Sequence, residues 1–309
     1  MGVVWRVVVV VGGLAGCYQP ATATGVPCSA IDNACPGGQV CISGTCERAD
    51  TIPTDSQLDA AVVAADAVPD VPPNVWSPPT EVPGINSTSF EDDPSFTPDR
   101  LTIVFMSNRN GTEDIFLGTR ITTTEPFTVA LLDTVSDPVV DDGSPELSED
   151  GDTLLFVSDR GPDPDVYRSQ RTDGVWSTPV RDDELSATGM AESDVAISPD
   201  GLTAIVTRGG RLFRATRATT ADPFDTPVQL PAVFGMGPNA PSLTGTGDLY
   251  FHADTVRNLY TSRLVGATYQ PPVPITELNT AARESGPFVS EDEHHLMFSQ
   301  DGKIVESTR

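Results

Sequence analysis

A four-residue turn motif recurs five times along the last three quarters of the chain, and its spacing constrains the fold more than any other feature. The motif is clearest where Ser-Glu-Asp-Gly begins at Ser148 and Ser-Pro-Asp-Gly begins at Ser198. Successive copies are 51, 50, 46 and 46 residues apart. Repeats of about 40–50 residues are typical of β-propeller blades, each a four-stranded sheet. The first residues of the five copies are Thr97, Ser148, Ser198, Thr244 and Ser290.

An unbroken apolar run follows each turn and predicts a strand that is buried on both faces. A sheet packed between two neighbours needs such strands, whereas a sheet with one solvated face would alternate apolar and polar residues. A second short apolar segment follows each run and is expected to be its hairpin partner. The chain is therefore predicted to be all-β. The five runs are 103–105, 154–156, 204–206, 249–251 and 296–298.

An aromatic residue opens the outer-strand segment of each repeat and settles the number of blades. These aromatics precede the next turn by 21, 21, 22, 20 and 21 residues. The first, Trp76, comes before the first turn, and none follows the last turn. We therefore predict that residues 75–85 complete the last blade and close a five-bladed propeller over 75–309, which also hides two sheet edges. The aromatics are Trp76, Phe127, Trp176, Phe224 and Tyr269.

The repeats resemble the WD-like propeller repeat of the TolB family. The resemblance rests on the Ser-Pro-Asp-Gly turn and on the Asp-Val-Tyr strand at 165–167, and it covers about residues 75–309. It is weakest in the fourth repeat, where Thr244-Gly245-Thr246-Gly247 has no acid. The family is used mostly for binding, so the resemblance implies a binding protein of the cell envelope.

Residues 1–16 have the features of a lipoprotein signal peptide. Arg6 supplies the positive charge, Val7 to Val11 form the apolar core, and Leu-Ala-Gly-Cys ends at Cys17. This tetrapeptide resembles the lipobox of bacterial lipoproteins, which implies that Cys17 is acylated and begins a lipid-anchored tether over 17–27. Tyr18 stands where an inner-membrane retention signal would have aspartate, which favours the outer membrane or cell surface. The alternative is an ordinary secretory peptide with an unmodified cysteine.

The four remaining cysteines lie within residues 28–46, a segment too short to build a hydrophobic core. An exported chain reaches an oxidising compartment, so two disulfides are expected, with three connectivities open. A zinc knot is the alternative, but the segment has no Cys-x-x-Cys pair and no nearby histidine. The four are Cys28, Cys35, Cys41 and Cys46.

Composition predicts a linker, and net charge limits the classes of partner. Residues 47–74 are rich in Ala, Pro and Asp, which predicts a disordered linker. The whole chain carries a formal net charge of −26, from 44 acidic and 18 basic residues. Such a chain repels phosphate backbones, so no nucleic-acid partner is expected. We expect a monomer.

Four acids precede the turn landmarks by six residues and are predicted to enter the innermost strands near the central channel. Acids that converge on one axis repel one another, which raises their pKa values or recruits a cation, so a calcium or ligand site is one hypothesis. In the alternative, each acid binds backbone amides of its own interblade loop. Separate ion pairs within two hairpins are expected, between Arg109 and Asp114 and between Arg160 and Asp165. In the alternative, these residues bind a ligand. The four acids are Glu91, Asp142, Glu192 and Glu284.

Two functions from different classes follow. The first is a membrane-anchored binding or scaffold protein for a protein or glycan partner, with no catalytic residues and no cofactor beyond calcium. The second is a glycoside-processing enzyme that uses two axial carboxylates about 5–10 Å apart. No nucleophile elbow or phosphate-binding loop appears in the sequence. A narrow, filled channel favours binding, and a deep axial pocket with facing carboxylates favours the enzyme.

Overall fold

The structure is a computed structural model that describes residues 39–42, 45–48, 75–231, 234 and 237–309. The chain divides into two compact units, Met1–Val68 and Pro69–Arg309. The part of the chain described contains no helix with the length and hydrophobicity needed to span a membrane. The signal peptide, Cys17, Cys28, Cys35 and most of the 47–74 linker lie outside the described residues.

In the first unit, β1 (Gln39–Ile42) and β2 (Thr45–Arg48) form an antiparallel pair. Their register places Cys41 opposite Cys46. The two disulfides stay a prediction.

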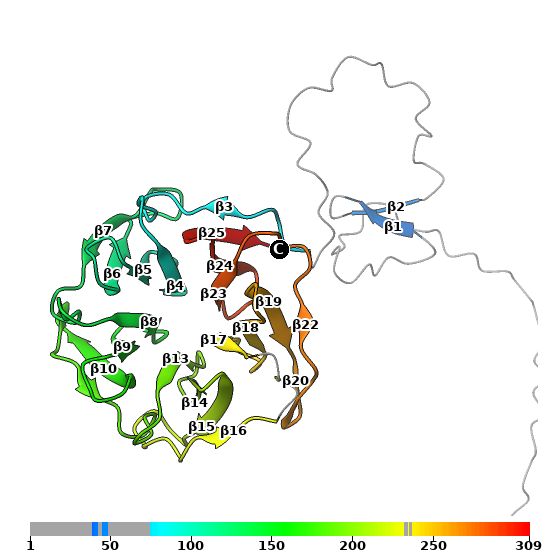
Figure 1. Cartoon of the computed structure of the whole chain (residues 1–309). Helices are drawn as coiled ribbons and strands as arrows, with labels where there is room; N and C mark the ends of the chain where they lie inside the picture. The colour runs from blue at the N-terminus through cyan, green and yellow to red at the C-terminus, as the bar shows by residue number, and fades with distance from the viewer. Residues whose placement is uncertain (1–38, 43–44, 49–74, 232–233, 235–236) are drawn as a thin grey trace, which may run out of the picture. The chain divides into compact units, whose positions relative to one another are not determined.

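The second unit is a five-bladed propeller, as the repeats predict, and its five antiparallel sheets surround a central axis (Figure 1). The innermost strands are β4 (Glu91–Phe96), β8 (Asp142–Leu147), β13 (Glu192–Ile197), β17 (Asn239–Leu243) and β23 (Glu284–Val289). The second strands are β5 (Thr102–Ser107), β9 (Thr153–Ser158), β14 (Thr203–Arg208), β18 (Leu249–Ala253) and β24 (His295–Gln300).

The third strands are β6 (Asp114–Thr119), β10 (Asp165–Thr172), β15 (Arg211–Thr216), β19 (Asn258–Ser262) and β25 (Lys303–Thr308). The outer strands are β7 (Thr128–Leu131), β12 (Val180–Arg181), β16 (Val228–Gln229), β22 (Val273–Pro274) and β3 (Thr80–Glu81). Two further short strands, β11 (Val175–Trp176) and β21 (Thr268–Tyr269), hold outer-segment aromatics, and β20 (Leu264–Val265) pairs with β21. Blades 1 to 5 are named below by their inner strands in chain order, β4 to β23.

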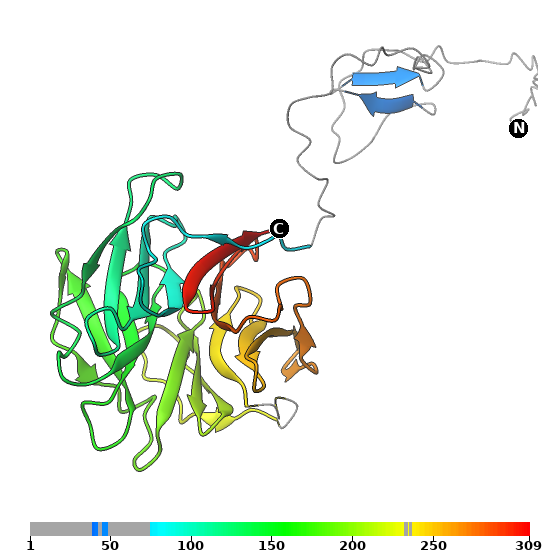
Figure 2. The same cartoon turned by 45° about the horizontal axis from the view of Figure 1, so that its top comes forward.

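The predicted ring closure is confirmed. Strand β3 pairs antiparallel with β25, with Glu81 opposite Val305. The amide of Ser77 donates to the carbonyl of Thr308 at 2.8 Å, so pairing also extends along the segment before β3. Figure 1 and Figure 2 both show the cyan segment that contains β3 beside the red β25. Blade 5 therefore consists of three strands from one end of the propeller sequence and one from the other.

The hydrophobic core lies between blades as five separate clusters. The second strands supply their centres, and Phe105, Phe156, Phe251 and Phe298 are among the largest fully buried side chains. Burial of these strands on both faces explains their unbroken apolar runs. All five outer-segment aromatics are buried, and each joins the cluster between its own blade and the preceding one.

Candidate functional site

The four acids predicted from the repeat spacing each occupy the first position of an innermost strand. Glu91 begins β4, Asp142 begins β8, Glu192 begins β13 and Glu284 begins β23. All four side chains are almost completely buried. Blade 4 has no acid here, because Pro238 takes this position just before β17.

We call these four residues the strand-entry acids. Each is bound by side chains of its own blade and by the loop that precedes its strand. Asp142 accepts a bond from Arg160 at 2.7 Å and one from the amide of Asp137 at 2.6 Å. The same Arg160 also donates to the carbonyl of Val135, so one guanidinium joins the acid to the interblade loop. In blade 3, Arg208 binds Glu192 at 2.6 Å and the carbonyl of Leu185 in the same manner.

Blade 5 uses uncharged partners for the same purpose. Glu284 accepts hydrogen bonds from the amide and hydroxyl of Thr280 at 3.2 and 2.6 Å, and from Gln300 at 3.3 Å. Among the residues described, its Oε2 atom finds no hydrogen-bond partner.

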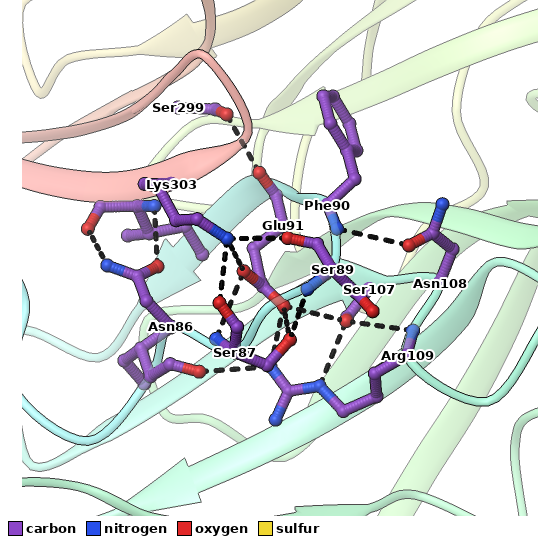
Figure 3. A network of polar contacts seen from close by, with 12 residues as sticks. Asn86, Ser87, Ser89, Phe90, Glu91, Ser107, Asn108, Arg109, Ser299 and Lys303 are labelled. Carbon is purple, nitrogen blue, oxygen red and sulfur yellow. Dashed lines mark hydrogen bonds and ion pairs between the residues drawn. The ribbon is translucent and has the colours of Figure 1, made fainter.

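Glu91 has the most contacts of the four, and Figure 3 shows its network. Arg109 donates to its Oε1 atom at 3.1 Å, and the amide of Ser87 donates to Oε2 at 3.2 Å. Lys303 of blade 5 reaches Oε2 at 3.3 Å and also the carbonyls of Ser87 and Ser89. The acid therefore links blade 1 to blade 5 across the closure of the ring.

These contacts agree with the alternative in which each acid organises its own interblade loop. Both expected hairpin ion pairs are wrong. Arg109 folds back over Phe105 and Phe116 and pairs with Glu91. Arg160 pairs with Asp142, and Asp165 pairs with Arg181. In the described ranges no group of three or more His, Cys, Asp or Glu side chains is placed to hold a metal ion. Calcium binding at these acids stays a prediction, which a calcium titration of the wild-type chain and Glu284→Gln tests.

A second set of acids, which the sequence reasoning missed, lies one or two residues beyond the strand-entry acids. Its members are Asp92, Asp93 and Asp194. Here the pairing with the second strand is interrupted, and Asp93, Ser144, Ala240 and Gly286 have positive φ values between 47° and 55°. The interruption turns the side chains of Asp93, Ser144 and Asp194 toward the axis, where they line a cavity of only about 20 Å³. We call this cavity the axial constriction. Four prolines share its lining: Pro94, Pro145, Pro241 and Pro287.

The axial carboxyls are difficult to ionise. Burial raises the pKa of Asp194 to about 7. Burial, with the neighbouring Asp92 and Asp194 carboxylates, raises the pKa of Asp93 well above its usual range. Ser144 donates a hydrogen bond to Asp93 at 3.2 Å, whereas the Oδ2 atom of Asp194 has no partner in the described part of the chain.

A larger cavity of about 300 Å³ lies on the axis beyond the constriction, at the end where the turn motifs cluster. We call it the turn-face pocket. Its apolar floor contains the last residue of every innermost strand, so all five blades contribute to it. These residues are Phe96, Leu147, Ile197, Leu243 and Val289, and Phe288 packs edge-on against Phe96 at 4.7 Å between ring centroids.

The turn motifs supply a charged rim to the turn-face pocket. Three carboxylates, Glu149, Glu291 and Asp292, line it and are exposed. Arg100 lines it as well and donates a hydrogen bond to Nδ1 of His295 at 3.0 Å. Burial and the Arg100 charge lower the pKa of His295, so its ring is neutral at pH 7. The rim is therefore acidic overall.

Glu146 is a buried acid that lines both the turn-face pocket and the axial constriction. Its Oε1 atom accepts a hydrogen bond at 3.0 Å from the amide of Ile197 in the next blade. Ser95 and Ser242 make the same interblade bond at the equivalent positions of blades 1 and 4, to Leu147 and Val289. A serine therefore suffices for the structural bond, and blade 2 has a carboxyl group in its place.

Burial raises the pKa of Glu146 to about 8, so the side chain is mostly a neutral carboxylic acid at pH 7. A buried acid with a strongly raised pKa in a pocket is a candidate functional group. The sequence carried a signal for it, since an alignment of the five inner strands shows Ser, Glu, Ala, Ser and Phe at this position. The sequence analysis placed the candidate site at the strand-entry acids instead, because those acids recur in four of the five repeats.

Comparison with solved structures supports the architecture. A GH62 hydrolase, solved in complex with xylotriose, matches with a TM-score of 0.53 and 11% identity over 76% of this chain and 96% of that one. The catalytic domain of the Coprinopsis cinerea GH62 α-L-arabinofuranosidase matches with a TM-score of 0.51 and 12% identity, over the same shares. These likenesses concern the fold alone.

Structures of TolB are also among the neighbours. TolB from Acinetobacter baumannii shares 18% identity over 73% of this chain, with a TM-score of 0.48. The chain spans 56% of the length of that protein. Neither the family models nor the curated proteins compared with the sequence match it.

Proposed function

We propose that this protein is a lipid-anchored propeller of the cell envelope that binds a protein or glycan partner at the turn-face pocket. The observation that carries the proposal is the pocket itself. It is formed by all five blades, has an apolar floor and a charged rim, and contains a buried acid where two other blades have serine. Apolar concave sites with a few convergent polar groups are the usual form of binding sites.

The narrow axis supports binding over catalysis through the channel. At the axial constriction the free volume is about 20 Å³, close to that of one water molecule. Three of the four strand-entry acids, Glu91, Asp142 and Glu192, pair with Arg109, Arg160 and Arg208 respectively, which hold them away from an axial ligand.

Blocking the pocket tests the proposal. In Ile197→Trp the larger side chain on the floor should fill the pocket, whereas Val228→Trp places the same residue on an exposed outer strand. Capture from envelope extracts and glycan-array binding should be lost only in Ile197→Trp, with equal melting temperatures confirming that both variants fold. Equal binding by the two variants would contradict the proposed site.

The proposed anchor rests on the N-terminal sequence. We expect Cys17 to carry the lipid and to place the propeller in the outer membrane or at the cell surface. Metabolic labelling with a palmitate analogue should mark the wild type, and Cys17→Ser should abolish labelling. A labelled Cys17→Ser variant would rule out acylation at this residue.

A glycoside-processing enzyme is the second candidate, and Glu146 is the observation that favours it. A carboxyl group with a pKa of about 8 is protonated at neutral pH, as a general acid must be. The likeness to two GH62 structures concerns fold only, but it makes arabinofuranosides and xylosides the first substrates to try. Hydrolysis by the wild type that is abolished in Glu146→Gln would support this candidate over simple binding.

A further inference from the structure

We propose that the turn-face pocket receives a cationic side chain, arginine or lysine, from a protein partner. This inference rests on the proposed binding function and specifies the chemistry of its ligand.

Charge is the first argument. Glu149, Glu291 and Asp292 line the rim and are negatively charged. Arg100 contributes a positive charge, and its hydrogen-bond partner His295 is neutral. The rim is thus net negative at neutral pH. The whole chain, at −26, adds an attractive field for a cationic partner. Burial, followed by the charges of Glu291 and Asp150, raises the pKa of Glu149, as expected for acids set close together. A ligand cation would relieve that repulsion.

The apolar floor is the second argument. Arginine and lysine have a hydrocarbon stem and a charged end, and they bury the stem against apolar surface where the charge has a polar partner. Leu147, Leu243 and Val289 provide that surface, and the volume of about 300 Å³ suits a single long side chain. A small hydrophilic anion would find neither the charge nor the surface it needs.

Glu146 is the third argument, because it lies where the pocket meets the axial constriction. Only its Oε1 atom is needed for the bond to Ile197, which a serine makes elsewhere. The carboxyl group can become a carboxylate when a cation arrives, whereas serine cannot.

Binding should therefore release a proton. Burial alone keeps Glu146 mostly protonated at pH 7, and a cation beside it favours the ionised form. The other titratable and charged groups lining the two cavities that Glu146 lines are few. Asp93 and Asp194 lie on the constriction side, and Arg100, Glu149, Glu291, Asp292 and His295 lie on the pocket side. Since the cation binds the ionised acid more tightly, its affinity should rise with pH.

Calorimetry on the whole chain tests this inference with acetyl-arginine amide as the probe. Acetyl-citrulline amide has nearly the same shape without the charge and serves as the matched control. From pH 6.5 to 8.5 the arginine probe should gain affinity on the order of tenfold, as expected for the release of one proton. Titrations in two buffers with different ionisation enthalpies should detect that proton.

Glu146→Ser is the informative variant, because serine is the native residue at this position in two other blades. It should keep the fold, bind the arginine probe more weakly and lose the pH dependence. Equal affinity for the citrulline probe, or an affinity that falls as pH rises, would overturn the inference.

The two proposals can fail separately. If Ile197→Trp still captures a partner, the pocket is not the binding site. If capture depends on the pocket but the arginine probe neither binds nor competes, binding at the pocket stands and the cationic ligand is rejected.

Discussion

The guanidinium of Arg309 lies over the indole ring of Trp76, 4.4 Å from its centroid. The same contact, between an arginine directly after the third strand and an outer-segment aromatic, joins Arg120 to Phe127 and Arg217 to Phe224. In those blades the two partners are close in sequence. In blade 5 the two partners come from opposite ends of the propeller sequence. A contact that is local in the other blades therefore forms here between the two segments that close the ring.

Trp76→Ala should strongly destabilise the propeller. The indole is 4% exposed and packs with Tyr250, Phe298 and Val305 between blades 4 and 5. Removal of a buried aromatic side chain costs about 3–5 kcal/mol. Urea unfolding followed by circular dichroism measures the loss, with Val228→Ala on an exposed outer strand as a control that should change little. A loss as small as that of the control would show that the closing segment contributes little.

Glu91→Gln should weaken the same closure through electrostatics. The carboxylate is fully buried and pairs with Arg109 and Lys303, so its neutralisation leaves two cations without their counter-charge. Breaking a buried ion pair on one side costs about 3 kcal/mol. Denaturant midpoints of Glu91→Gln, Lys303→Met and the double variant measure the coupling. The exposed Glu81→Gln is the control, and strictly additive effects would argue against a direct link between the blades.

Gly286→Ala should be far more destabilising than Gly266→Ala, although both glycines have positive φ values, 55° and 64°. A Cβ at Gly286 would lie 2.6 Å from the backbone nitrogen of Asp93 and from the Oδ1 atom of Asp92. A Cβ at Gly266 would meet nothing within 4 Å. The strain of the left-handed conformation, about 1 kcal/mol, is common to both, so the difference isolates the clash. Thermal melts compare the two, and equal losses would mean that the inner strands can separate freely.

Asp194→Asn should become relatively more stable than the wild type as pH rises from 5 to 8. Burial raises the folded-state pKa of Asp194 to about 7 from an ordinary value of 3.8. Between these two values the folded state binds more protons than the unfolded state, so this group makes stability fall with increasing pH. The variant lacks that contribution.

Melting temperatures at pH 5, 6, 7 and 8 measure this effect. The gap between variant and wild type should change by several degrees, because the two pKa values imply a change of about 2–3 kcal/mol between pH 5 and pH 8. Asp183→Asn, at a side chain that is 85% exposed, is the control and should follow the wild type. A constant gap for Asp194→Asn would show that Asp194 is not desolvated.

The repeat pattern alone was enough to predict the blade count, the buried second strands and the pairing of 75–85 with the last blade. Each of these depends on residue type at regular spacing, and β-sheets packed between neighbours impose that spacing on the chain directly. The strand-entry positions of Glu91, Asp142, Glu192 and Glu284 were predictable for the same reason.

Tertiary structure decided the partners and the candidate site. Arg109 is nearer to Asp114 in sequence, but the antiparallel hairpin places the end of β5 beside the start of β4, so the arginine reaches Glu91. The sequence shows that blade 2 has Glu146 at the position where blades 1 and 4 have Ser95 and Ser242. The raised pKa of Glu146, however, comes from its burial where the five blades converge. Convergence on an axis brings together residues about 50 positions apart in sequence. A local sequence pattern therefore does not determine how far their side chains are buried from solvent.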